Sequence, residues 1–179
     1  IMDLPLKAKG REAVEKMNSL GMLVDVSHLN DGGFADVAAT CGKNTPFIAT
    51  HSNARSITNV CRNLTDSQLH TIAEHGGLAG LNFCGAFLLP TASGAPISRG
   101  PMGAESRIED MVRHTLHIYK IAGRQSLALG TDFDGIGGKL EVSSLAGMPR
   151  LRDALAKAGL SQSVLDDMWE NNALRILER

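Results

Sequence analysis

The chain of 179 residues lacks the long apolar and basic runs that mark membrane proteins and nucleic-acid-binding proteins. No apolar stretch approaches the roughly 20 residues that a helix needs to span a membrane. No cluster of Lys or Arg suggests a nucleic-acid surface. Acidic and basic residues number 19 and 18, and the two kinds are interspersed. We therefore expect neither a membrane segment in this chain nor a nucleic-acid partner.

Cysteine is also scarce, and the three cysteines, Cys41, Cys61 and Cys84, form no CxxC pair. Such a sparse, odd set argues against a disulfide framework and favours a reducing compartment, so we expect a cytoplasmic location. The first residues, 1–3, resemble neither a signal peptide nor a natural start. We therefore expect a chain that represents part of a longer protein.

The composition that is present fits one globular domain over residues 1–179. Apolar residues make up 43% of the chain and charged residues 21%, as in typical soluble proteins. A chain of this length can bury a substantial core. No low-complexity tract divides it, and no repeat is visible beyond an alternation of helix-like and strand-like segments.

That alternation predicts the fold class. Unbroken apolar runs predict strands at residues 22–28, 46–52, 78–83 and 126–131. Apolar periodicity and capping signals predict helices at residues 7–20, 31–41, 65–75 and 104–122, and helices opened by Pro149 and Ser161. Residues 84–103 are rich in Gly, Pro and Ser and are expected to form a long loop. We predict an α/β fold in which about four parallel strands alternate with helices.

Three of the predicted strands end on residues that can bind a metal, namely His28, His51 and Asp132. The carboxyl ends of parallel strands form the active-site rim of a (β/α)8 barrel, which typically takes about 250 residues. This chain is long enough for about half of one. Two imidazoles on neighbouring strand ends can share one metal ion, and a carboxylate there can bind metal or move a proton. The alternatives are rim histidines bonded to backbone and an aspartate that caps the next segment.

Other polar residues have weaker signals. His114 and His117 lie three apart in a predicted helix, which we expect on the outer layer, away from the strand ends. Arg62 follows the second predicted strand, where a guanidinium suits a substrate carboxylate and a surface salt bridge is the alternative. The run from Asp132 to Gly135 opens like a calcium loop but lacks the later ligands, so we exclude a calcium site.

Taken together, the segments resemble the membrane (renal) dipeptidase family, peptidase family M19, within the amidohydrolase-like metal barrels. The resemblance covers nearly the whole chain, in order. It rests on five stretches: Leu20–His28 (LGMLVDVSH), Thr50–Ser56 (THSNARS), Arg62–Asp66 (RNLTD), Gly76–Phe83 (GGLAGLNF) and Gly130–Gly135 (GTDFDG). The resemblance implies the C-terminal half of a (β/α)8 TIM-like barrel.

The resemblance implies hydrolysis of dipeptides at a centre of two zinc ions. It makes His28 and His51 ligands of one zinc ion. It makes Asp132 a ligand at the other zinc ion and the residue that relays a proton to the departing amine. The attacking group in such a reaction is a metal-activated water.

The same resemblance implies a substrate pocket and an assembly. Arg62 would hold the free carboxylate of the dipeptide, and Gly135 and Phe87 would lie near the substrate. The expected partner is therefore a dipeptide substrate. The expected assembly is a homodimer or a pairing with the missing N-terminal half.

The N-terminal half of the family is absent from these residues. That half supplies an HxD pair, a glutamate that bridges the metals and a substrate-facing histidine, and no HxD triplet occurs here. Catalytic zinc sites usually have three protein ligands, so we expect this chain alone to bind zinc weakly and to hydrolyse dipeptides poorly. The alternative function is a catalytically incomplete half-barrel that serves as a folding or assembly module through its open strand edges. A mononuclear zinc hydrolase of another amidohydrolase type would need further ligands.

Overall fold

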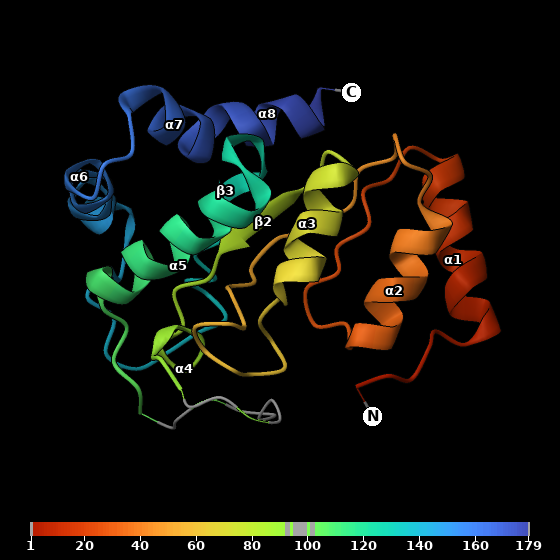
Figure 1. Ribbon diagram of the computed structural model, residues 1–179, viewed down its shortest axis with the longest axis horizontal. Coiled ribbons are helices and arrows are strands. Elements are labelled where there is room, and N and C mark those ends of the chain that lie inside the picture. Colours follow the sequence, from red (N-terminus) through yellow and green to blue (C-terminus); the bar gives the residue numbers. More distant parts are fainter. Residues whose placement is uncertain (1, 92–93, 95–99, 101–102, 179) are drawn as a thin grey trace.

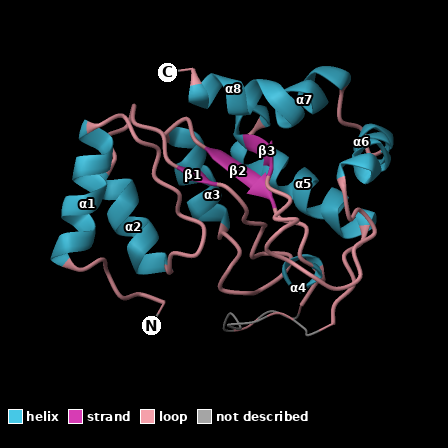
Figure 2. Ribbon diagram, turned by 180° about the vertical axis from the view of Figure 1, so that it is seen from behind, coloured by secondary structure: helices cyan, strands magenta, loops and turns pink. Residues whose placement is uncertain are grey.

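A small parallel sheet lies at the centre of the fold. The computed structural model of the chain describes residues 2–91, 94, 100 and 103–178. The strands are β1 (Ile48–Ala49), β2 (Leu78–Leu81) and β3 (Leu127–Leu129). They are parallel and lie in the order β1-β2-β3, with Ile48 opposite Leu78 and Ala79 opposite Leu127 (Figure 2). The predicted α/β class with parallel strands is confirmed.

The first predicted strand, residues 22–28, joins the sheet through a single bridge. Asp25 pairs in parallel with Ile48. Two backbone hydrogen bonds flank the bridge, from Ile48 N to Val24 O at 2.9 Å and from Val26 N to Ile48 O at 2.8 Å. The expectation of about four strands is therefore wrong for the described residues, in which the sheet has three strands and residues 22–28 add only this bridge to it.

The pairing of residues 22–28 with β1 stops because the Asp25 side chain accepts hydrogen bonds from the next backbone N–H groups. Asp25 Oδ1 accepts hydrogen bonds from Thr50 N at 3.0 Å and from Ser27 N at 2.9 Å. Thr50 N is thereby bonded to a carboxylate and not to the backbone of the neighbouring segment. The chain then turns at His28, which has a positive φ of 76°, a conformation that a strand does not contain.

The predicted helices are confirmed, although α5 begins at Ile108 and not at Ala104. The helices are α1 (Ala8–Ser19), α2 (Asp31–Thr40), α3 (Asp66–Glu74), α4 (Gly85–Leu88), α5 (Ile108–Ala122), α6 (Met148–Lys157), α7 (Gln162–Asp166) and α8 (Asn172–Leu177), with the 3-10 helices η1 (Arg124–Ser126) and η2 (Leu145–Gly147) and the π-helix η3 (Asp167–Asn171). The predicted capping box is present, since Gln68 N donates to Thr65 Oγ1 and Thr65 N donates to Gln68 Oε1. Ser161 caps α7 as expected.

The segment 84–103, predicted as a long loop, contains the short helix α4. Residues 92–93, 95–99 and 101–102 of this segment lie outside the described residues. In Figure 2, α4 lies on the side toward which the β2 arrow points. The helix therefore stands near the carboxyl ends of the strands, and it carries Phe87 there.

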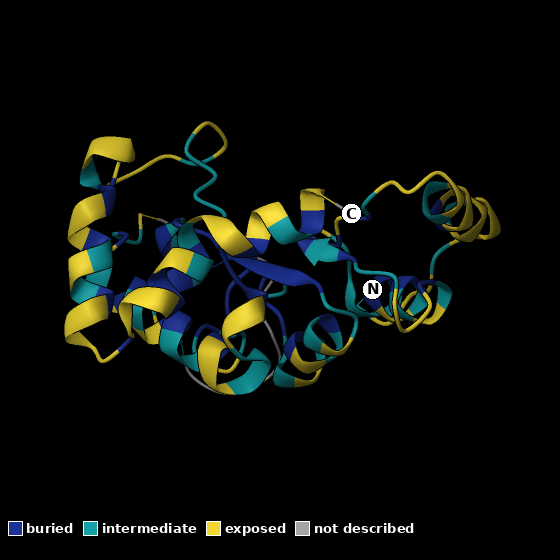
Figure 3. Cartoon of the chain, turned by 90° about the horizontal axis from the view of Figure 1, so that it is seen from above, coloured by how far each residue is buried: buried dark blue, intermediate teal, exposed yellow. Residues whose placement is uncertain are grey.

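The two faces of the sheet bury different clusters of side chains. Ala79 and Leu127 belong to the main core, together with apolar side chains of α3 and α5, which cover that face (Figure 1). Leu78 and Ala128 belong to a second, smaller cluster with Ile176 of α8. Figure 3 shows most of the sheet buried and the outward sides of the helices exposed, and β2 is buried along its whole length. The alternation along each strand thus assigns one face to the main core and the other to α8.

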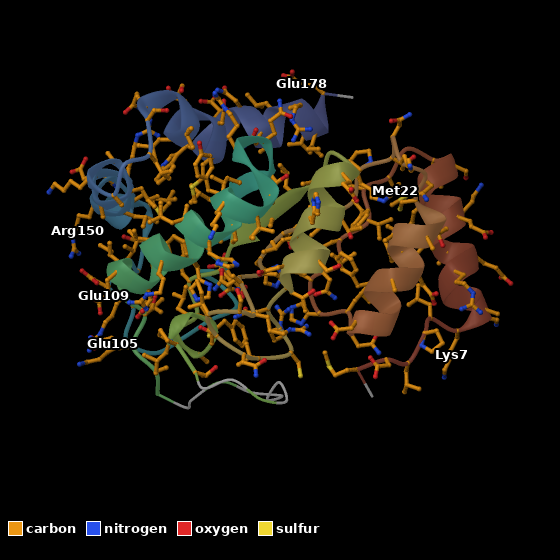
Figure 4. The ribbon with its side chains drawn as sticks, in the orientation of Figure 1. Lys7, Met22, Glu105, Glu109, Arg150 and Glu178 are labelled. Atoms are coloured by element: carbon orange, nitrogen blue, oxygen red, sulfur yellow. The ribbon has the colours of Figure 1, made fainter. Side chains whose placement is uncertain are left out.

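Several charged side chains lie on the outside of the helices and loops. Lys7, Glu105, Glu109 and Arg150 point away from the body of the chain in Figure 4. Within the described part of the chain, none of the helices combines the length and the apolar character that crossing a membrane requires.

Candidate active site

Four polar side chains follow neighbouring parallel segments at one edge of the sheet. His28 comes after the bridge at Asp25, His51 after β1, Asn82 after β2 and Asp132 after β3. Because the strands are parallel, their carboxyl ends meet at one edge, which is where active sites of α/β proteins are built. Three of the four residues are those predicted from the sequence.

His28 and His51 face each other through the same ring atom. Their Nε2 atoms are 3.0 Å apart, and the ring centroids are 5.0 Å apart at an angle of 58°. Burial, the charge of Arg62 and the charge of His51 lower the pKa of His28, while Asp132 and Asp25 oppose the shift. The pair therefore directs two imidazole nitrogens toward one point, and the lowered pKa of His28 favours its neutral form, which is the form that binds a metal.

Arg62 lies at the same point and not in a surface salt bridge. Its Nη2 is 3.1 Å from His28 Nε2, and its guanidinium carbon lies 5.4 Å from the centre of the Phe87 ring. Burial lowers the pKa of Arg62, and the charges of Asp132 and Asp25 oppose that shift. A guanidinium held on an aromatic face keeps its charge and is limited in orientation, which suits a fixed carboxylate partner.

Asp132 is held in an uncommon backbone conformation by its neighbours. Its φ is +59°, and its carbonyl accepts hydrogen bonds from Gly135 N at 2.9 Å and Ile136 N at 3.1 Å. A Cβ atom at Gly135 would overlap the Asp132 carboxylate. Asn82 Nδ2 donates to Asp132 Oδ2 at 3.1 Å. Asp132 thus closes a turn with its backbone while its carboxylate points to Asn82, beside a glycine that leaves room for it.

Buried asparagines that the sequence reasoning missed support the site. Asn53, Asn63 and Asn82 are at most 1% exposed. Asn53 and Asn82 exchange two hydrogen bonds of 2.8 and 2.9 Å, and Asn63 Nδ2 donates to Phe87 O at 2.9 Å. The available signal was the polar residue Asn82 at the end of the apolar run 78–83, directly after β2.

Arg55, which the sequence reasoning also missed, binds the loop that carries Arg62 to the start of α2. Its guanidinium forms two hydrogen bonds with Asp31 at 2.7 and 2.8 Å, and its Nε donates to Asn63 O at 2.8 Å. Asp31 opens α2, three residues after His28. The hydrogen bonds of Arg55 to Asp31, a paired and charge-assisted contact, therefore tie the loop of Arg62 to the segment of His28.

The expectation that the His114 helix faces away from the strand ends is wrong for His114 itself. Helix α5 covers the face of the sheet that belongs to the main core. His114 on this helix is fully buried beneath the loop after β1 and helix α4. Its Nδ1 accepts from Ala54 N at 3.1 Å, and its Nε2 donates to Leu88 O at 3.1 Å. His114 therefore joins the loop after β1 to helix α4, and its role is structural.

Acid should weaken the fold through His114. Burial lowers the pKa of His114 from its ordinary value of 6.5 to about 4, so the folded state resists protonation that the unfolded chain accepts. Stability is unaffected by this group above pH 6.5 and falls by about 3 kcal/mol as the pH drops from about 6.5 to about 4. Urea unfolding at a series of pH values measures the loss, and His114→Gln should show a shallower dependence. His70→Gln, at an exposed histidine of α3, is the control; equal pH dependence in wild type and His114→Gln contradicts the assignment.

Metal ligands within the described residues are few. No group of three or more His, Cys, Asp or Glu side chains there converges as a complete metal site. The convergent pair is His28 and His51, and Asp132 is close enough for its charge to act on His28 and Arg62. All six predicted site residues nevertheless lie at one edge of the sheet, with Phe87 against Arg62 and Gly135 against Asp132.

Comparisons with known proteins match this arrangement to one family. The family of membrane dipeptidases, peptidase family M19, matches residues 3–179. A protein of Klebsiella pneumoniae, described as an uncharacterized protein in the pqqA 5' region, is 39% identical over 97% of this chain and 60% of its own length. This chain thus spans less than two thirds of that relative.

Two solved structures resemble the chain closely. The crystal structure of dipeptidase AC, a metallopeptidase of family M19, has a TM-score of 0.86 and 35% identity over 99% of this chain and 50% of that one. A metallopeptidase from Rhodobacter sphaeroides, liganded with a phosphinate mimic of the dipeptide L-Ala-D-Ala, has a TM-score of 0.85 and 35% identity, covering 99% of this chain and 48% of that one. The chain spans about half the length of these solved structures.

Proposed function

The chain belongs to the membrane dipeptidase family, peptidase family M19, and we propose that it carries the C-terminal half of the active site of a zinc-dependent dipeptidase. The observation that carries this proposal is the convergence of the His28 and His51 Nε2 atoms beside Arg62 at the carboxyl edge of the sheet. The dipeptide mimic bound by the Rhodobacter sphaeroides relative supports dipeptides as the substrate class.

The two histidines fit a single zinc ion. Nitrogen ligands lie about 2.1 Å from zinc, so two of them at an angle of about 90–109° are about 3.0–3.4 Å apart. The observed separation of 3.0 Å falls within that range. We assign His28 and His51 to one ion and Asp132 to the second. Two such ions, when bound, polarise the scissile carbonyl and lower the pKa of the water that attacks it.

The remaining site residues bind substrate and move a proton. Arg62 pairs with the free carboxylate of the dipeptide, and Phe87 holds the guanidinium in place from one side. Asp132 accepts the proton of the attacking water and returns it to the departing amine. Gly135 leaves room for the Asp132 carboxylate, which a Cβ atom at that position would overlap, and we place Gly135 near the substrate for this reason. In this scheme Arg62 binds the substrate carboxylate and Asp132 transfers the proton.

The half-barrel proposal is supported by the face of the sheet that packs on α8, where a cavity remains. A cavity of about 200 Å³ lies over that face, and its lining includes Ile48, Leu78, Ala128 and the α8 residues Ala173 and Ile176. Apolar surface of this kind is covered in a complete barrel by further strands. We propose that the remainder of a family M19 barrel, or a second copy of this chain, packs there, with the first favoured because the chain spans about half of its solved relatives.

The competing function is a catalytically incomplete module for folding or assembly. It is favoured by one observation, namely that the described residues contain no cluster of three or more metal-ligating side chains. The two functions differ in whether a longer protein that contains this chain, with an HxD segment ahead of it, turns over substrate.

Zinc dependence of dipeptide hydrolysis tests the function. We expect the full-length protein to hydrolyse dipeptides, to lose activity when a chelator removes zinc and to regain it when zinc returns, because the ions supply the attacking water. The 179-residue chain alone should be poorly active, because two histidines and one aspartate do not complete the site. Release of amino acids measures both. Robust zinc-dependent turnover by the 179-residue chain contradicts the half-site proposal, and a zinc-loaded full-length protein without dipeptidase activity contradicts the function.

A further inference from the structure

We propose that Asp25 and Thr50 are positioning residues that fix the protonated nitrogen of His51 and so turn its Nε2 lone pair toward the metal. This inference rests on the proposed function, because it assigns a purpose to His51 as a zinc ligand. It is carried by a chain of two short contacts, from Asp25 Oδ2 to Thr50 Oγ1 at 2.6 Å and from Thr50 Oγ1 to His51 Nδ1 at 2.7 Å.

The direction of the protons along this chain is determined by Asp25. An ionised carboxylate only accepts hydrogen bonds, and its Oδ1 already accepts from Ser27 N and Thr50 N. At 2.6 Å from Oδ2, the Thr50 hydroxyl must donate its single hydrogen to the carboxylate. The other nearby acceptor, Ser27 Oγ, is more distant at 3.4 Å. The oxygen of Thr50 is then left to accept, so His51 must carry its proton on Nδ1.

The opposite nitrogen of His51 is thereby free to bind a cation. A neutral imidazole has one proton, so the Nδ1–H tautomer leaves a lone pair on Nε2. That lone pair faces His28 Nε2 at 3.0 Å, and His28 Nε2 is itself 3.1 Å from Arg62, which can only donate. With both nitrogens acting as acceptors, no proton lies between the two rings. A metal ion satisfies both lone pairs, and a ligand histidine that donates its other N–H to a fixed acceptor is the usual arrangement.

The same carboxylate also ties together the two segments that carry the histidines. Asp25 precedes His28 in the sequence, and it holds both the backbone and the hydroxyl of Thr50, the residue before His51. Ser27 adds a further link, because its Oγ accepts from His51 N at 3.1 Å. The orientation of one ligand and the spacing of the two ligands are thus set by the same small group of residues.

Asp25→Asn provides a sharp test because it should reverse the direction in which hydrogen bonds are donated between residue 25, Thr50 and His51. The introduced amide oxygen should stay on the side of the two backbone donors, Ser27 N and Thr50 N, since an NH2 group there would oppose both. The NH2 group would then face Thr50 Oγ1 and donate to it. The hydroxyl of Thr50 would donate in turn to His51 Nδ1, and the proton of His51 would move to Nε2, where a metal must bind.

The experiment measures the tautomer and the zinc affinity in the full-length protein. Nitrogen-15 NMR of the metal-free protein at neutral pH should report Nδ1–H for His51 in wild type and Nε2–H in Asp25→Asn. Competition with a chelator should show zinc affinity lowered about 10- to 100-fold in Asp25→Asn and in Thr50→Val, which removes the hydroxyl at nearly constant volume. Thr50→Ser, which retains the hydroxyl, should keep the wild-type tautomer of His51 and should bind zinc more tightly than Thr50→Val. Circular dichroism checks that each variant is folded.

The outcomes separate this inference from the proposed function. If wild-type His51 carries its proton on Nε2, or if Asp25→Asn and Thr50→Val keep the wild-type zinc affinity, the positioning role is wrong even in an active dipeptidase. If the tautomers and affinities shift as expected but the zinc-loaded protein hydrolyses no dipeptide, the positioning role stands and the dipeptidase function fails.

Discussion

Replacing His51 with alanine in the full-length protein is expected to lower kcat/KM for dipeptides by about three orders of magnitude. A metal site supplies several kcal/mol of transition-state stabilisation, and each 1.36 kcal/mol corresponds to a tenfold change in rate. The Nε2 atom of His51 lies 3.0 Å from that of His28, so alanine removes one of the two convergent nitrogens. Steady-state kinetics and the zinc content of the purified variant measure the effect.

The fold should survive this substitution. The imidazole of His51 is partly exposed and lies outside both apolar clusters. Its backbone hydrogen bond to Ser27 Oγ does not involve the side chain. The thermal midpoint is therefore expected to change little while activity is lost. His70→Ala, on the exposed side of α3, is the matched control. Near-normal dipeptidase activity in His51→Ala would remove His51 from the site.

Local signals in the sequence predicted the helices, and all three strands lie within predicted strand segments, although β1 is only two residues long. The capping box at Thr65 and Gln68 and the cap at Ser161 determine helix starts through contacts between residues a few positions apart. The apolar runs of β2 and β3 were recognised because both faces of these strands are covered. The family resemblance, which rested on motifs spread over the chain, is confirmed by the match over residues 3–179.

The segment 22–28 could not be predicted correctly from its apolar pattern. Its residues have the composition of a buried strand, but Asp25 accepts the backbone donors of Ser27 and Thr50 and ends the pairing. Whether an aspartate side chain competes with a strand partner depends on a residue 25 positions away. A periodicity argument contains no such information.

The candidate ligands were accessible to sequence reasoning because strand ends have a recognisable pattern, but their supports were not. Asn53 and Asn82 are 29 residues apart and Ala54 and His114 are 60 apart, and each pair meets only in the folded chain. The helix of His114 was predicted, yet the inward direction of that side chain depends on the position of the loop after β1. Supports of this kind are set by tertiary contacts, so a single sequence carries little trace of them.

The position of Asp132 leads to the second large effect, a loss of kcat in Asp132→Asn. The amide occupies nearly the same volume and can still accept from Asn82 Nδ2, so the turn and its bond to Asn82 should persist. It cannot take up a proton from water. Losing general acid–base catalysis typically costs about 10²- to 10⁴-fold, and we expect a fall in kcat in that range at saturating zinc.

Because Arg62 and Phe87 are unchanged, substrate binding in Asp132→Asn should be affected far less than turnover. The expected signature is a large loss of kcat with a modest change in KM, measured by steady-state kinetics with zinc in excess. Asp134→Asn is a close control, because Asp134 is exposed and lies two residues further along the same turn. Wild-type kcat in Asp132→Asn would show that another group carries the proton, and an equal loss in both variants would show that the turn, and not the Asp132 carboxylate, is responsible.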